Sequence, residues 1–253
     1  MTKTCKHLAN AAVAAVALIS SGLGLAAPTI YFGENLSPAQ IVSGAPLTAR
    51  NSFVSALTGV GTETFESLTT GTGEPQTLTF TGSTGNISAQ LAGSGVVFET
   101  PSSAGRFNTT GATAAPVSGK WWLVDDNTDP FTITFGTPIA AFGFYGTDIG
   151  DFNGRITLGL RDSSGGLTSL TVDNTVIAPD GSLLFWGFID TSTTYTSITF
   201  GNTSAGTDQF GFDDMIVGDR GQIVDPNPAP EPASLALVAT GLLGLAALRR
   251  RRR

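Results

Sequence analysis

The feature that most limits the fold of this chain is an alternation of apolar and polar residues with a period of two. In 131–135 phenylalanine and isoleucine alternate with threonine, and in 142–145 the two phenylalanines fall on one face. Successive side chains of a β-strand point to opposite faces, so each such segment predicts a half-buried strand. The segments predicted to be strands are 77–80, 87–91, 96–99, 121–124, 131–135, 142–145, 156–161, 170–173, 183–189, 196–200 and 210–217.

Short turns separate these segments, and no helical period comes between them. Thr-Gly-Ser at 81–83, Asp-Ser-Ser-Gly-Gly at 162–166 and Pro-Asp-Gly at 179–181 are typical turn sequences. Many short strands at regular spacing indicate an all-β fold, an antiparallel, jelly-roll-like β-sandwich. We expect this domain to span 61–220.

The stretch 27–60 is expected to lead into the sandwich and to contain a short helix. Phe53 and Leu57 lie four residues apart, and Pro46 precedes them at a position suited to a first helical turn. Gly59 is predicted to end the helix.

The N-terminus has the pattern of a secretory signal peptide, predicted here as a helix over 1–26. Lys3 and Lys6 precede an apolar run at 11–19, and small residues follow at Gly24 and Ala26. We expect signal peptidase to cleave after Ala26. An uncleaved membrane anchor is the alternative, although the apolar run is short for a bilayer.

The C-terminus carries a second apolar segment. Residues 234–248 are uncharged, and at 15 residues they would form a helix of about 23 Å, close to what a thin bilayer requires. Five arginines follow directly, and such a cluster stays on the cytoplasmic side of a membrane. The sequence predicts a short transmembrane helix at 234–248, preceded by a proline-rich spacer at 221–229.

The order of these C-terminal features resembles the PEP-CTERM sorting signal (230–253 here) of bacterial proteins processed by exosortase. It consists of Pro230, Glu231 and Pro232, the short apolar helix, and the terminal cluster that begins with Arg249 and Arg250. The resemblance implies transient anchoring in the inner membrane, cleavage near the Pro-Glu-Pro by exosortase, and a secreted or cell-surface protein. A plain tail anchor would share the helix and the arginines but would not need the Pro-Glu-Pro.

The exported region lacks the side chains on which much enzyme chemistry depends. The single cysteine and the single histidine are Cys5 and His7, both within the predicted signal peptide. Serine and cysteine triads and Cys/His zinc sites are therefore excluded after cleavage. We expect a protein that is not an enzyme, with a carboxylate-dependent glycosidase as the least favoured alternative.

Charge also limits the partners. Seven of the 13 basic residues lie at the two ends, which leaves six between them against 20 acidic residues. Nucleic acid requires lysine and arginine patches, so no nucleic-acid partner is expected.

Two acidic places are candidate calcium sites. Asp148, Asp151 and Asn153 lie close together in a glycine-bearing loop, and Ca²⁺ prefers such oxygen ligands. The alternative is a polar turn whose side chains bond the backbone. Asp214 shares the parity of the apolar residues in 210–217, so it requires a bulge, an arginine, several N–H donors or a cation.

The tandem tryptophans are a candidate glycan contact. Adjacent residues of a strand face opposite ways, so one indole of Trp121 and Trp122 can fill the core while the other lies outside and stacks on a sugar. Packing of both is the alternative.

Together these features predict a non-catalytic envelope or extracellular-matrix protein. The alternative is a carbohydrate-binding module that uses Ca²⁺ as a structural ion and contacts extracellular polysaccharide.

Overall fold

The computed structural model describes residues 27–99, 105–111, 118–125, 129–204, 206 and 208–224. The helices predicted at 1–26 and 234–248 lie outside these residues, as do the spacer from residue 225 and the Pro-Glu-Pro. Within the described part of the chain, no helix is long and apolar enough to cross a membrane.

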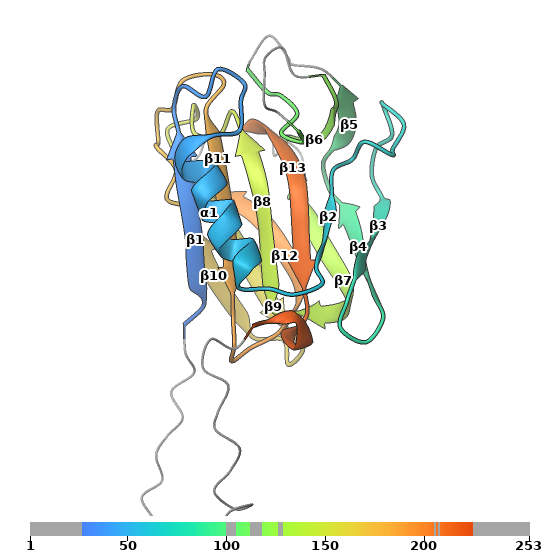
Figure 1. The fold of residues 1–253 in the computed structure, drawn as a ribbon. Helices are drawn as coiled ribbons and strands as arrows, with labels where there is room; N and C mark the ends of the chain where they lie inside the picture. Colours follow the sequence, from blue (N-terminus) through green and yellow to red (C-terminus); the bar gives the residue numbers. More distant parts are fainter. Residues whose placement is uncertain are drawn as a thin grey trace, which may run out of the picture.

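Two antiparallel sheets stack face to face, which confirms the predicted β-sandwich (Figure 1). In the described residues the first sheet has seven strands, and β2 (Gly61–Glu63) pairs with its fourth member. The order of the other six is β1 (Thr29–Asn35), β11 (Leu183–Ile189), β8 (Ala141–Thr147), β13 (Gln209–Gly218), β6 (Lys120–Asp125) and β5 (Val96–Glu99).

The second sheet has six strands over the described residues, and the chain passes repeatedly from one sheet to the other, as in a jelly roll. Its order is β10 (Leu167–Thr171), β9 (Ile156–Asp162), β12 (Tyr195–Asn202), β7 (Thr132–Ile139), β4 (Asn86–Ala92) and β3 (Gln76–Thr81). Each strand predicted from the alternation is present, with bounds that differ by a few residues.

The main core lies between the sheets and is rich in aromatic rings. Phe144 and Phe212 come from neighbouring strands of the first sheet, and their ring centroids are 4.9 Å apart. Phe200 of the facing sheet meets both rings edge-on, at 5.6 and 5.9 Å. Such contacts add to the free energy gained by burying apolar area.

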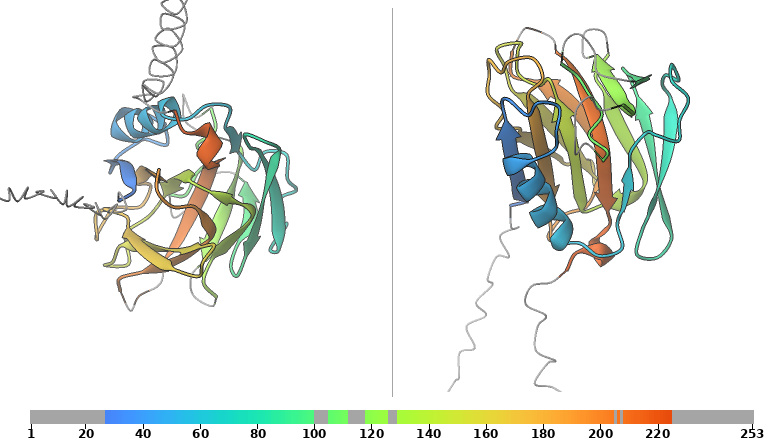
Figure 2. Two further views of the ribbon diagram at one scale, coloured as in Figure 1. Left: turned by 90° about the horizontal axis from the view of Figure 1, so that it is seen from below. Right: turned by 45° about the horizontal axis from the view of Figure 1, so that its top comes forward.

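Helix α1 (Gly44–Ser55) covers the outer face of the first sheet (Figure 2). Phe53 is fully buried there and packs on Tyr31 and Phe185. Because α1 covers one face and the second sheet the other, all seven residues of β8 and of β11 are buried. This cover explains the uninterrupted apolar run at 183–189.

The stretch 27–60 belongs to the sandwich instead of only leading into it. Its strand β1 pairs along its whole length with β11 and forms an edge of the first sheet. The helix ends at Ser55, before Leu57, which bridges to Ile223 near the last described residues. The 3-10 helix η1 (Arg220–Gln222) and the start of β1 lie at the same end of the sandwich (Figure 1).

Candidate functional site

A bulge in β13 places two adjacent carboxylates on the outer face of the first sheet. The register against β8 shifts after Asp213, and Asp214 has a left-handed φ of 48°. Phe212 and Met215 both pack in the core between the sheets. Asp213 lies opposite Tyr145, whose side chain packs on the α1 side. The bulge is therefore what keeps the Asp214 carboxylate out of the apolar core.

The segment 105–111 supplies hydrogen bonds to this pair. The backbone N–H and the hydroxyl of Thr109 both donate to Asp213 Oδ2, at 2.7 and 2.9 Å. The hydroxyl of Thr110 donates to Asp214 Oδ1 at 2.8 Å, and that of Thr109 also reaches Asp214 Oδ2 at 3.3 Å. Each carboxylate thus has donors from the same short segment.

Burial raises the pKa of both carboxyl groups. For Asp213, which is fully buried, desolvation is the largest cause and the neighbouring charge of Asp214 adds to it. For Asp214, desolvation again dominates, and the Thr110 hydroxyl and the Arg50 guanidinium oppose it. Like charges this close resist simultaneous ionisation, so the pair holds protons more tightly than free aspartates do.

A cavity of about 360 Å³ opens beside Asp214, between α1 and the sheet. We call it the Arg50–Tyr145 cavity; its lining residues are Val42, Leu47, Arg50, Thr62, Thr64, Thr109, Thr110, Gly111, Tyr145 and Asp214. Arg50 Nε and the Tyr145 hydroxyl are both buried and have no hydrogen-bond partner among the described residues. Desolvation also raises the pKa of Tyr145, so its hydroxyl stays protonated.

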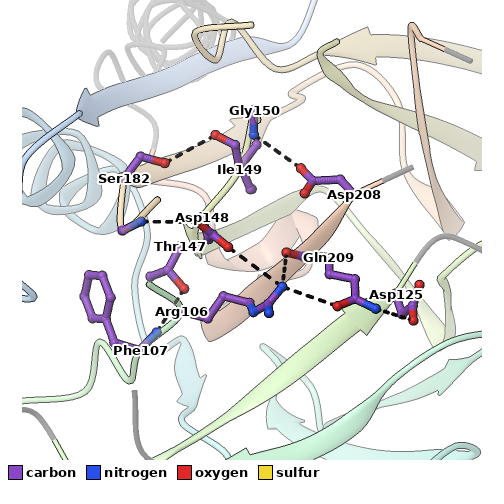
Figure 3. Close-up of polar contacts among 11 residues, drawn as sticks. Arg106, Phe107, Asp125, Thr147, Asp148, Ile149, Gly150, Ser182, Asp208 and Gln209 are labelled. Atoms are coloured by element: carbon purple, nitrogen blue, oxygen red, sulfur yellow. Dashed lines mark hydrogen bonds and ion pairs between the residues drawn. The ribbon is translucent and has the colours of Figure 1, made fainter. Parts of the chain in front are cut away.

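A second polar cluster surrounds Asp148 after the end of β8 (Figure 3). Asp148 is buried and accepts a hydrogen bond from the Gly181 N–H at 3.2 Å. Arg106 Nη1 lies 3.8 Å from Asp148 Oδ2 and donates to the Gln209 carbonyl oxygen at 2.8 Å. Desolvation raises the pKa of Asp148 to about 7, although the Gly181 hydrogen bond and Arg106 act in the opposite direction. The cluster attaches the segment 105–111 to the end of the sheet.

The predicted calcium ligands do not gather at one point. Asp151 and Asn153 are exposed, whereas Asp148 is buried against Arg106. Asp148 and Asn153 have left-handed φ angles of 66° and 58°, which these residue types tolerate in turns. Asp214 contacts Thr110 in the other cluster. Among the described residues, no group of three or more acidic, histidine or cysteine side chains could hold a metal ion. Calcium binding stays a prediction.

Trp121 and Trp122 are both fully buried, so neither indole provides the exposed surface that the glycan-contact hypothesis requires. Trp122 packs in the core between the sheets, where it stacks on Phe65 with ring centroids 6.1 Å apart. Trp121 is covered on the opposite face, and Phe98 lies 5.2 Å from it. Packing of both indoles is the alternative that the structure favours.

Sequence patterns missed the residues that complete both clusters. Arg50, Arg106 and Tyr145 come from segments far apart in the chain, and the segment 105–111 has no strand or helix period. One signal was available: only six basic residues lie between the two termini, and Arg50 and Arg106 are two of them. A scarce charge in an acidic domain deserves examination as a partner for a buried carboxylate.

Comparison with known proteins identifies the C-terminal tail. The family model described as a PEP-CTERM protein-sorting motif matches residues 228–252. The chain carries a PEP-CTERM sorting motif. The match includes Pro230, Glu231 and Pro232 as well as Arg249 and Arg250, and it confirms the resemblance seen in the sequence. Such a motif implies a surface protein sorted by exosortase.

The comparisons add little about the domain in front of this motif. No curated protein matches the chain in sequence. A solved structure described as TmCBM61 in complex with β-1,4-galactotriose is 14% identical, covering 51% of this chain and 86% of that chain, with a TM-score of 0.24. This likeness is too distant to carry an argument about the fold or the ligand of this chain.

Proposed function

We propose that this chain is an exported, non-catalytic β-sandwich protein that exosortase processes at its tail and that acts in the cell envelope or extracellular matrix. The observation that carries the proposal is the sorting motif at 228–252, which begins four residues after the folded domain. Signal peptidase removes 1–26 after Ala26, and 234–248 holds the precursor in the inner membrane until cleavage.

The position of the last described residues supports this route. The Val224 N–H donates to the Ala56 carbonyl oxygen at 2.9 Å, which fixes the chain to the end of the sandwich that carries η1. Pro230 is six residues further on, so the covalent chain keeps it within about 22 Å of Val224. The end of the sandwich with η1 and the start of β1 would therefore face the membrane during processing.

The acidic pair does not have the arrangement of the two catalytic carboxyl groups of a glycosidase. Glycosidases place two carboxyl groups on opposite sides of a scissile bond, about 5–9.5 Å apart. Asp213 is fully buried, and both it and Asp214 contact the same threonine, Thr109. Carboxylates that share a donor on one side of a strand do not flank a substrate.

The test is the mass and location of the processed protein in its bacterial host. We expect the unaltered protein to be released from the inner membrane with a mass that reflects cleavage after Ala26 and near Pro230–Pro232. A variant with alanine at 230, 231 and 232 should remain in the membrane with its tail attached. Pro226→Ala, which changes a spacer proline outside the motif match, is the matched control and should be processed normally. Normal release of the triple variant would contradict the proposal.

The carbohydrate-binding alternative was based on an exposed tryptophan side chain that would stack on a sugar, and the structure does not provide one at 121 or 122. Its stacking platform required an exposed indole, and both Trp121 and Trp122 are buried. A role in holding extracellular polysaccharide would need a different site.

A further inference from the structure

The Arg50–Tyr145 cavity contains hydrogen-bonding groups that the fold leaves unused. Tyr145 is only 1% exposed, yet its hydroxyl lacks a hydrogen-bond partner among the described residues. Arg50 Nε is also buried and also lacks a partner among these residues. Both residues line one cavity. Buried polar groups are nearly always paired because an unpaired one loses its hydration without replacement. Two such groups on residues that line one cavity indicate a place for a bound molecule.

A second buried tyrosine shows how this fold treats a structural hydroxyl. The Tyr195 hydroxyl is also buried, and it donates to Asp190 Oδ2 at 2.6 Å. The same carboxyl group accepts two backbone N–H bonds through Oδ1. The fold therefore completes the hydrogen bonds of one buried tyrosine and leaves the hydroxyl of the other without a partner among the described residues.

The charges around the cavity disfavour an ion of either sign. Arg50 would attract an anion, but Asp214 lies in the same wall and Asp213 is next to it. A cation would be attracted to the acidic pair and repelled by Arg50. A neutral ligand that has both donors and acceptors avoids these conflicts.

The lining groups match a ligand with several hydroxyls. Arg50 and Tyr145 can donate, Asp214 can accept, and the hydroxyls of Thr62 and Thr64 can do either. Leu47 and Val42 add apolar surface for carbon–hydrogen faces. A volume of about 360 Å³ lies within the range of small-molecule sites.

We propose that the Arg50–Tyr145 cavity binds a neutral sugar residue, with Arg50 and the Tyr145 hydroxyl donating to its oxygens and Asp214 accepting from one of its hydroxyls. The site lies on the α1 face of the sandwich and involves neither tryptophan. It is independent of the proposed sorting route, because the cavity is formed by residues 42–214 alone.

The test is calorimetric titration of the full chain, purified in a detergent without a sugar headgroup, with D-glucose, D-galactose and D-mannose. We expect saturable binding of at least one of these hexoses. Tyr145→Phe removes only the open hydroxyl, and Arg50→Met removes the charge but keeps an unbranched side chain; each should weaken binding at least tenfold. Tyr195→Phe is the matched control and should bind as the unaltered protein does.

Three results would overturn the proposal. The first is a lack of binding by all three hexoses, which would mean that solvent alone serves the two open groups. The second is unchanged affinity in both Tyr145→Phe and Arg50→Met. The third is tighter binding of acetate or ethanolamine than of any hexose, which would assign the cavity to ions. Thermal melting of each variant shows whether it is folded, and removal of an unpartnered hydroxyl should not prevent folding.

Discussion

Gly143 and Gly187 lie directly opposite each other in strands β8 and β11, and the ring of Phe53 packs on both. A Cβ built on Gly143 would lie 3.0 Å from the Phe53 ring, and one on Gly187 would lie 3.1 Å from it. The missing side chains thus form the depression in which the helix sits. This pair lets α1 approach the sheet and cover its outer face.

Gly143→Ala should destabilise the protein by about 1–3 kcal/mol, because the added methyl group overlaps both Phe53 and Phe185. Urea unfolding followed by circular dichroism measures the change. Gly159→Ala in β9 is the control, since its nearest neighbour would be the Thr199 oxygen at an ordinary 3.7 Å. If neither Phe53→Leu nor Phe185→Leu reduces the cost of Gly143→Ala, the steric explanation is wrong.

The two buried tyrosines should differ in their contributions to stability. Tyr195→Phe removes a hydrogen bond to a carboxylate and should lower the free energy of unfolding by about 1.5–3 kcal/mol. Tyr145→Phe removes a hydroxyl without a partner and should change it by less than about 0.5 kcal/mol, or raise it. Denaturant midpoints of the two variants test this, and a larger loss in Tyr145→Phe would show that its hydroxyl is bonded in solution.

Stability should fall as pH rises from about 4 to about 7. Burial raises the pKa of Asp148 from 3.8 to about 7, so the folded state binds more protons than the unfolded state in this window. This contribution to stability is complete below the unfolded-state pKa of 3.8 and is lost as the pH rises through the folded-state pKa of about 7. Asp213 and Asp214 also have raised pKa values and act in the same direction.

Asp148→Asn should flatten this dependence, since an amide does not titrate and asparagine tolerates the left-handed φ of 66°. Free energies of unfolding measured at intervals between pH 4 and pH 8 give the slope of stability against pH for the unaltered protein and for Asp148→Asn. The control is Asp173→Asn, which changes an aspartate whose side chain is 72% exposed. An unaltered slope in Asp148→Asn would mean that this carboxyl group is not protonated by folding.

Arg106 should hold down the pKa of Asp148. Its guanidinium lies 3.8 Å from the carboxylate, and its charge opposes the effect of burial. Arg106→Met should therefore move the Asp148 titration to higher pH, which carboxyl-carbon nuclear magnetic resonance can follow. Loss of the bond to the Gln209 carbonyl oxygen should also destabilise the protein, by about 1.5–3 kcal/mol. An unchanged Asp148 pKa in Arg106→Met would show that the ion pair has no effect on this pKa in solution.

Local features of the sequence were sufficient for the strands and for the sorting tail. Alternation in 131–135 is a property of neighbouring residues, so it identifies β7 whatever the strand pairs with. The Pro-Glu-Pro, the apolar segment and the arginines likewise act as a linear signal.

Tertiary structure decided which faces are covered and which charges meet. Period-two parity would turn Asp214 inward, but a bulge in β13 turns it toward α1. Alternation placed Trp121 opposite Trp122, yet could not show that its outer face is also buried. Arg50 reaches Tyr145 across almost a hundred residues of chain, because α1 lies on the sheet. Periodicity reports which side a residue faces, whereas the burial of that side depends on segments distant in sequence.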